Sequence, residues 1–106
     1  MKELTQILQN INNCIDNYND LPLEDYKRQS EILRDLTTNL FFLESHRVKS
    51  YEDWLRSYYK NEGSNAAREK KADNEIKERY LIKRTMTSAY KVVDSIRSTI
   101  SIYKKE

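Results

Sequence analysis

The chain has 106 residues, of which 38% are hydrophobic and 34% are charged, and it contains a single glycine and a single proline. A β-sandwich or β-barrel needs a turn about every 8–12 residues, so this shortage of turn residues excludes both classes. The net charge of +2 is unevenly distributed: residues 1–45 hold four basic and eight acidic residues, a net of −4, and residues 46–106 hold fifteen and nine, a net of +6. We therefore expect one all-α domain, residues 1–106, whose basic half favours a polyanionic partner.

The first predicted helix covers about residues 3–18. Its apolar residues recur at alternating intervals of four and three, as in a narrow coiled-coil seam: Leu4, Leu8, Ile11, Ile15 and Tyr18. Pro22 ends this segment, because proline lacks an N–H and disfavours a helical conformation of Leu21. Cys14 is the only cysteine and lies beside the seam, so we expect a small packing residue, no intrachain disulfide and a reducing compartment.

The second predicted helix covers about residues 24–60, with no breaker before the sequence around Gly63. Its seam consists first of Leu33, Leu36, Leu40 and Leu43, and after a slip it resumes as Val48, Tyr51, Leu55 and Tyr58. A slip of this kind rotates the buried stripe around the helix. Gly63 can supply the positive φ that a helix end favours, and Ser64 or Asn65 can cap the helix that follows.

The third predicted helix covers about residues 65–104. It carries the most regular apolar pattern, in steps of four and three: Ile82, Met86, Ala89, Val93, Ile96, Ile100 and Tyr103. The predicted fold is thus all-α with three helices. The two long helices form an antiparallel hairpin at Gly63, and the first helix packs near their far ends.

Two narrow seams leave apolar edges exposed, so we expect a coiled-coil-like homo-oligomer. A monomeric three-helix bundle is the alternative. The residues expected to form the contact between subunits are Ile82, Met86, Val93, Ile96, Ile100 and Tyr103.

Catalytic, metal and membrane functions have no support in the sequence. His46 is the only histidine, and no His/Cys/Asp cluster has the spacing of metal ligands. A phosphate-binding loop needs glycines that the chain lacks, and carboxylates such as Glu75 stand at helical spacing from a cation such as Arg79. The longest apolar run, residues 40–43, is far shorter than the ~20 residues of a membrane span, and no export signal is visible. We expect a cytoplasmic protein that is not an enzyme and has no catalytic residue, metal or cofactor.

The residues on either side of Gly63 indicate a binding function instead. In an antiparallel hairpin, cations and aromatic rings from both helices converge at this point. Basic groups attract phosphates, and aromatic faces stack on unpaired bases. For Tyr58 and the neighbouring Trp54 the alternative is packing between the helices. We predict contact with single-stranded nucleic acid through Arg56, Tyr58, Tyr59, Lys60, Arg68, Lys70 and Lys71.

Two segments resemble phage recombination mediator proteins of the UvsY type. They are Leu55-Arg56-Ser57-Tyr58-Tyr59, which closes a long helix before the glycine-containing break, and the stretch from Ala72-Asp73 to Val92-Val93-Asp94-Ser95-Ile96-Arg97-Ser98-Thr99-Ile100. The resemblance covers about residues 45–105. It implies a small helical protein that assembles into rings, binds single-stranded DNA and helps to load a recombinase onto DNA covered by single-strand binding protein. The basic DNA-contacting residues of that family correspond here to Arg56 alone, because Glu52 and Asp53 stand upstream.

The leading hypothesis from the sequence is an oligomeric accessory protein of phage recombination or replication that binds single-stranded DNA, with a recombinase as a possible protein partner. One alternative is a phage or mobile-element inhibitor of a host nucleic-acid enzyme, such as a CRISPR effector or another nuclease. In that case carboxylates would imitate phosphates, and the cluster expected to do so is Asp16, Asp20, Glu24 and Asp25. A second alternative is a structural coiled-coil subunit, which needs only the seams.

Overall fold

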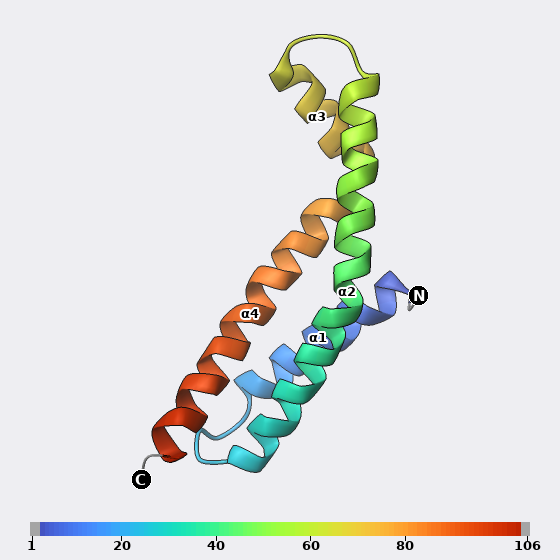
Figure 1. Ribbon diagram of the computed structural model, residues 1–106. Coiled ribbons are helices and arrows are strands. Elements are labelled where there is room, and N and C mark those ends of the chain that lie inside the picture. The colour runs from blue at the N-terminus through green and yellow to red at the C-terminus, as the bar shows by residue number, and fades with distance from the viewer. Residues whose placement is uncertain (1–2, 105–106) are drawn as a thin grey trace.

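The computed structural model describes residues 3–104, with the backbone alone for residues 103 and 104. Four α-helices follow one another in this range: α1 (Leu4–Asn19), α2 (Tyr26–Lys60), α3 (Asn65–Glu75) and α4 (Lys77–Lys104) (Figure 1). They form an elongated molecule with principal extents of 59 × 25 × 20 Å. The all-α expectation is confirmed, because the described residues contain no strand.

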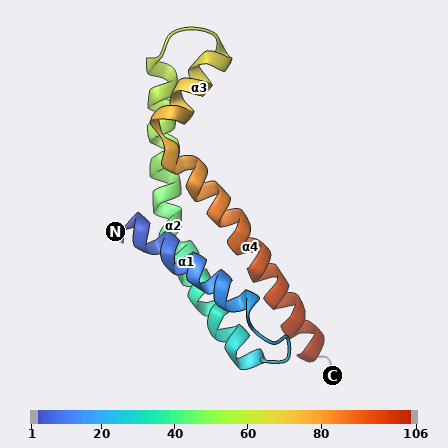
Figure 2. The same cartoon turned by 180° about the vertical axis from the view of Figure 1, so that it is seen from behind.

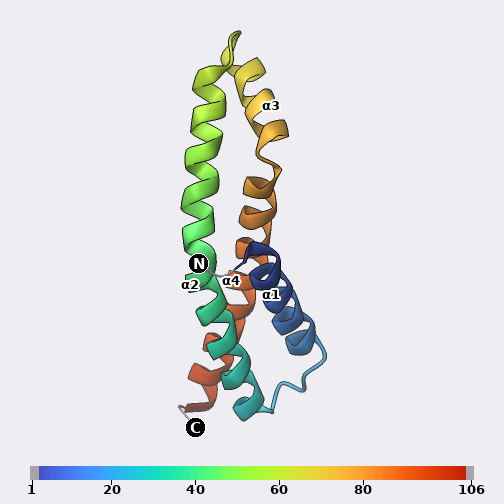
Figure 3. The same ribbon diagram turned by 90° about the vertical axis from the view of Figure 1, so that its right-hand side faces the viewer.

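The two halves of the molecule are built differently. α2 runs along the whole length, and the chain then doubles back so that α3 and α4 return antiparallel beside it (Figure 1). α1 contacts both α2 and α4 in the lower half. It lies behind α2 in Figure 1 and in front of it in Figure 2. α1 therefore covers one face of the α2–α4 pair and leaves the other face uncovered. In the upper half only α2 and α3 lie side by side, below the loop at residues 61–64 (Figure 3).

Local signals in the sequence explain where α2 and α3 begin. The Asp25 carboxylate accepts a hydrogen bond from the Arg28 N–H at 3.1 Å, and the Ser64 hydroxyl accepts one from the Ala67 N–H at 3.2 Å. Each bond satisfies one of the free N–H groups of a first helical turn. Gly63 has a φ of +117°, as its position between two helices predicts.

Replacing Gly63 with alanine is expected to lower the free energy of unfolding by about 1–3 kcal/mol, because residues with a Cβ adopt this backbone region only under strain. The added Cβ has room, since its nearest neighbour would be the Ala67 Cβ at 3.5 Å, so the cost comes from the backbone. Urea denaturation of Gly63→Ala and of the exposed control Glu62→Ala checks this. Equal midpoints for the two variants would contradict it.

The expectation of one continuous helix over residues 65–104 is wrong, and with it the count of three helices. Ile76 leaves the helical conformation, with φ −114° and ψ 67°, and separates α3 from α4. The break follows Asp73 and Asn74, which are poor helix formers. Ala72, before the break, and Ile82, after it, are both buried, at 0% and 1% exposure.

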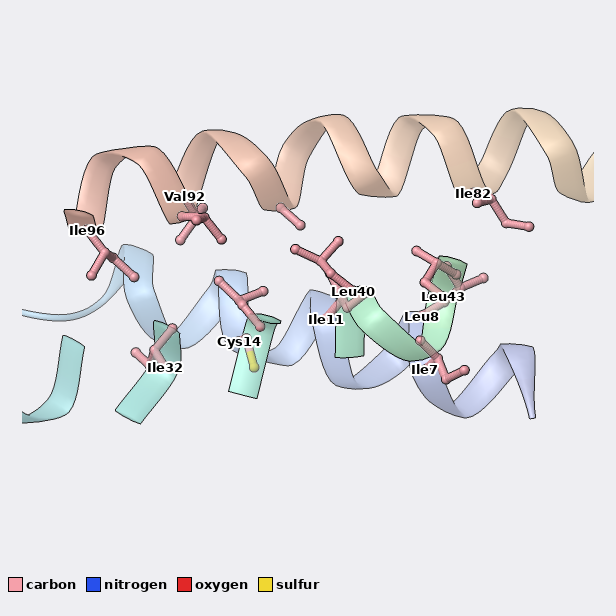
Figure 4. Close-up of a cluster of buried hydrophobic side chains, with 13 residues drawn as sticks. Ile7, Leu8, Ile11, Cys14, Ile32, Leu40, Leu43, Ile82, Val92 and Ile96 are labelled. Carbon is pink, nitrogen blue, oxygen red and sulfur yellow. The ribbon is translucent and has the colours of Figure 1, made fainter. Parts of the chain in front are cut away.

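The hydrophobic core lies in the lower half, where side chains from α1, α2 and α4 meet (Figure 4). Its buried members are Ile7, Leu8, Ile11, Cys14, Ile32, Leu36, Leu40, Leu43, Ile82, Ala89, Val92, Val93 and Ile96. Ile7 belongs to this cluster although the predicted seam omitted it. Cys14 is a packing residue, as predicted, and burial, with a smaller contribution from the charge of Asp35, raises the pKa of its thiol.

The predicted continuation of the α2 seam is correct only in part, because Leu55 and Tyr58 are half-buried. Val48 and Tyr51 are 42% and 45% exposed, whereas Ser50 and Ser57 are buried. Ser57 donates a hydrogen bond to Glu75 Oε2 at 2.6 Å. Contacts between α2 and α3 are therefore largely polar and aromatic, and the upper half has no counterpart of the aliphatic core below it.

The residues expected to join subunits lie largely inside the single chain. Ile82, Val93 and Ile96 are 1%, 2% and 0% exposed, and Met86 and Ile100 pack against the same core. The predicted contact of Tyr103 lies outside the described side chains. The apolar stripes of α2 and α4 form a closed core within one chain, because α1 covers the third side of this core. Association with further copies stays a prediction, and it would need the apolar groups that the α2–α4 pair leaves exposed.

Candidate nucleic-acid interface

Three aromatic side chains form a stacked row along the upper half of α2. The ring centroids of Tyr51 and Trp54 are 6.5 Å apart, with 8° between the ring planes, and those of Trp54 and Tyr58 are 5.5 Å apart, with 16° between the planes. Spacings of three and four residues place all three rings on one side of the helix. We call Tyr51, Trp54 and Tyr58 the aromatic row.

Two arginines from the returning helices lie over the aromatic row. The Arg79 guanidinium, from α4, is 4.6 Å from the ring centroid of Trp54 and 5.7 Å from that of Tyr51. The Arg68 guanidinium, from α3, is 5.8 Å from the ring centroid of Tyr58. These distances are within the ~6 Å typical of a cation–π interaction. The aromatic row and its arginines thus combine ring faces and positive charge from three helices.

Hydrogen bonds hold the edges of the aromatic row. Trp54 Nε1 donates to Asp73 Oδ1 at 2.8 Å, and the Tyr58 hydroxyl donates to Asn65 Oδ1 at 3.0 Å. Both side chains therefore pack between the helices, which is the alternative role that their sequence positions allowed. Tyr59 is different: it is 73% exposed and touches Tyr58 edge-on, with 5.1 Å between ring centroids.

The predicted basic residues of the tip do not form one surface. Arg56 lies two positions after Trp54, which is about 200° around α2, and it pairs with Asp53 at 3.4 Å. Lys70 and Lys71 are exposed on α3, and neither forms an ion pair with any other described residue. The tip therefore presents separate cations on different sides.

Lys60 is partly engaged with α3. Its Nζ lies 4.0 Å from Glu75 Oε2. The hydrogen bond from Ser57, and secondarily the charge of Lys60, hold the pKa of the Glu75 carboxyl below its usual value. Exposed pairs of this kind contribute little to stability, so Lys60 can exchange this carboxylate for a phosphate at small cost.

A cleft of about 440 Å³ lies between α2 and α4, next to the aromatic row and toward the middle of the molecule. Its lining residues, three cations among them and no carboxylate, are Arg47, Ser50, Tyr51, Arg79, Lys83, Met86, Thr87 and Tyr90. α1 contributes none of them, so the cleft lies on the face that α1 leaves uncovered. We call it the α2–α4 cleft.

Two hollows flank the α2–α4 cleft and share residues with it. The lower hollow, of about 310 Å³, is lined by Thr37, Leu40, Phe41, Glu44, Tyr90, Val93 and Arg97. The upper hollow, of about 350 Å³, is lined by Asp73, Ile76, Lys77, Arg79, Tyr80 and Lys83. Tyr90 lines both the cleft and the lower hollow, and Arg79 and Lys83 line both the cleft and the upper hollow, so the three are neighbours along α4. We call the three together the α2–α4 face.

Carboxylates neutralise only some of the cations on the α2–α4 face. Arg47 donates through Nε to Glu44 at 2.9 Å, and this bond raises the pKa of the guanidinium. In the described range, Arg79, Lys83 and Arg97 have no carboxylate within ion-pair distance. Positive charge therefore remains on this face beside the exposed rings.

Sequence reasoning missed the α2–α4 cleft, although part of its signal is visible. Arg79, Lys83 and Tyr90 follow one another on α4 at helical spacing, parallel to the apolar stripe. Arg47 and Tyr51 are similarly spaced on α2. What the spacing does not reveal is the register between the two helices, which brings both groups to the same depression.

The acidic cluster of the alternative inhibitor function lies at the opposite end from the aromatic row (Figure 1). Asp16, Asp20, Glu24 and Asp25 are all exposed, around the end of α1 and the connection to α2. Asp25 is also the N-cap of α2. A role of this cluster in mimicking phosphates stays a prediction.

The described residues offer neither a cluster of metal ligands nor a helix suited to a membrane. No group of three or more His, Cys, Asp or Glu side chains in residues 3–102 is arranged to hold a metal ion. None of the described helices combines the length and the apolar character that crossing a bilayer requires.

Comparisons with known protein families, with curated proteins and with solved structures find no match to this chain.

Proposed function

We propose that this protein binds single-stranded nucleic acid along the α2–α4 face, as an oligomeric accessory factor of recombination or replication. The observation that carries the proposal is the α2–α4 cleft, in which Arg79 and Lys83 lie beside exposed rings and no carboxylate lines the wall. Cations that have no carboxylate partner attract phosphates and release the counterions bound to them.

Exposed rings supply the second component of the proposed interaction. Tyr51 and Tyr90, in the cleft, are 45% and 48% exposed, and Phe41, in the lower hollow, is 77% exposed. Stacking of one base on an aromatic side chain contributes about 1–3 kcal/mol and depends little on the base. A face that offers both rings and cations therefore suits a flexible strand of any sequence.

The same features favour a single strand over a duplex. In a duplex the base faces are already stacked on each other, so exposed rings such as Phe41 gain nothing from contact with it. Sequence reading in the major groove requires a helix that projects into the groove. The α2–α4 face is instead a row of hollows along α4.

The resemblance to phage recombination mediators supports a DNA strand as the ligand and a recombinase as a protein partner. A single chain offers only a short face, so several copies on one strand would multiply weak individual contacts. We therefore expect several copies to bind one strand, although the regular apolar stripe of α4 is buried in the core of each chain.

Fluorescence anisotropy with an oligothymidine of about 20 nucleotides, long enough for more than one site, tests the proposal. We expect tighter binding to the single strand than to a matched duplex. We also expect affinity to fall steeply between about 50 and 200 mM salt. The double variant Lys77→Glu/Arg97→Glu, which reverses one exposed cation in each flanking hollow, should bind at least about tenfold more weakly.

The double variant Arg56→Glu/Lys70→Glu is the matched control, because it changes the net charge by the same amount on surfaces outside the α2–α4 face. We expect it to lose much less affinity. A larger loss in this control than in Lys77→Glu/Arg97→Glu would place the strand at the tip, where the sequence predicts it, and equal losses would count against a site on the α2–α4 face. No binding of oligothymidine by the parent protein at low salt would end the proposal.

A further inference from the structure

We infer that the α2–α4 cleft is a subsite for one nucleotide unit, with its phosphate held by Arg79 and Lys83 and its base placed against Tyr51 and Tyr90. This inference rests on the proposed function and makes it specific, because it assigns one place on the face to one phosphate and one base. A strand would then be anchored at the cleft and contacted more loosely in the flanking hollows.

The size of the cleft fits such a ligand. Its volume of about 440 Å³ lies within the range of roughly 300–1,000 Å³ that is typical of small-molecule sites. Ser50, which is 3% exposed, is one of its lining residues. The cleft is therefore a defined concavity between two helices that the core of the lower half holds in place.

The charges of the cleft call for an anion. Arg79 and Lys83 are four residues apart on α4, where like charges repel each other, and neither has a carboxylate partner within the described part of the chain. An anion placed between them would remove this repulsion. Phosphate fits best, because the planar guanidinium of Arg79 can bind two of its oxygens while Lys83 supplies a point charge.

The position of Arg79 prepares it for this role. Its guanidinium lies over the rings of Trp54 and Tyr51, at 4.6 and 5.7 Å from their centroids. Stacking of this kind uses the flat face of the group and leaves its N–H donors at the edge for a ligand. Trp54 is itself held by its hydrogen bond to Asp73, so the arginine has a fixed support.

The exposed rings of the cleft indicate that the ligand carries a base in addition to its phosphate. About half of the surface of Tyr51 and of Tyr90 is exposed. Their hydroxyl groups make no hydrogen bond to any described residue. Each tyrosine thus offers an apolar ring and a free polar end, which match the face and the edge of a base. A plain anion would leave the exposed ring of Tyr90 unused, and an apolar ligand would leave the cations unpaired.

Titration of the full chain with thymidine 5′-monophosphate, followed by NMR, tests the inference, with thymidine and inorganic phosphate as matched probes. We expect chemical-shift changes to be concentrated at Tyr51, Arg79, Lys83 and Tyr90. The monophosphate should bind about tenfold more tightly than either fragment, because each fragment lacks either the charged contact or the stacked one. Shifts located elsewhere, or equal affinity for phosphate and monophosphate, would overturn the inference.

Two neighbouring residues of α4 provide a matched pair of variants. Lys83 lines the cleft and Arg84 does not, and both are exposed, so neither substitution should disturb folding. Lys83→Gln is expected to weaken monophosphate binding about tenfold through loss of a charge-assisted contact, and Arg84→Gln is expected to leave it unchanged. Tyr90→Leu, which keeps apolar bulk but removes the aromatic ring, should reduce the preference for monophosphate over phosphate. Equal losses in Lys83→Gln and Arg84→Gln would count against the subsite.

Parallel measurements with oligothymidine separate this inference from the proposed function. Binding of oligothymidine without binding of the monophosphate would overturn the subsite and leave the proposed function in place. Binding of the monophosphate in the cleft without binding of oligothymidine would support the subsite as a site for free nucleotides and remove the proposed function.

Discussion

Replacing Leu36 with alanine is expected to lower the free energy of unfolding by about 2–5 kcal/mol. Leu36 is 0% exposed and belongs to the core in which α1, α2 and α4 meet. Its truncation removes buried methyl groups and leaves a cavity that three helices cannot readily fill. Since a domain of this size has a total stability of about 5–15 kcal/mol, the loss is a large fraction of the whole. Urea denaturation followed by circular dichroism measures it.

Leu81→Ala is the matched control for this experiment. It makes the same chemical change on α4, but Leu81 is 47% exposed, so we expect a change below about 1 kcal/mol. The contrast depends on α1 docking onto α2 and α4. Similar losses in the two variants would show that the core described for the lower half does not form.

Replacing Trp54 with alanine is expected to unfold α3 while the lower core stays intact. The change removes stacking with Tyr51 and Tyr58, the support of Arg79 and the hydrogen bond to Asp73. Together these contacts are worth about 2–4 kcal/mol. In α3 the only buried residue is Ala72, so this helix has little else to hold it. Hydrogen exchange should therefore show loss of protection in residues 65–75 and retained protection around Leu36.

Tyr59→Ala is the control for the Trp54 variant, because Tyr59 is a neighbouring aromatic residue with 73% of its surface exposed. We expect no change in the protection of α3 in this variant. If Trp54→Ala also leaves α3 protected, the aromatic row does not hold the upper half together. Loss of protection throughout both halves would instead show that the molecule unfolds as one unit.

Helix type and most helix ends could be predicted from the sequence, because they depend on local signals. α1 and α2 begin and end within about two residues of the predicted positions. Pro22, Gly63 and Ser64 act through their own backbone or side-chain chemistry, which does not require knowledge of the fold. The break at Ile76 could not be predicted in this way, because no proline or glycine marks it and it depends on how two helices pack against α2.

The candidate site was predictable only in part, for a related reason. The sequence draws attention to the rings and cations near Gly63, but it does not show which rings are already in use. Tyr58 is stacked on Trp54 and lies under Arg68, whereas Tyr90, far from the tip in sequence, lines the cleft. Such assignments depend on the register of α2 against α4, which many side chains determine together.

The seam of α2 shows the same limit at the level of single residues. Leu36, Leu40 and Leu43 are buried as their spacing predicts, but further along the helix the buried positions are Ser50 and Ser57. A pattern based on hydrophobicity cannot select serines. Ser57 is buried where it donates a hydrogen bond to Glu75 of α3, a contact that the spacing of apolar residues does not reveal.

The interruption at Ile76 has a mechanical consequence. A continuous helix transmits bending and torsion along its axis, because each carbonyl is tied to the N–H four residues ahead. A non-helical residue between α3 and α4 removes that stiffness, while Ile82 and Val93 anchor α4 in the core. The tip can therefore change in tilt without displacing Lys83, whereas Arg79 also depends on the upper half, because it lies over Trp54, which is hydrogen-bonded to Asp73 of α3.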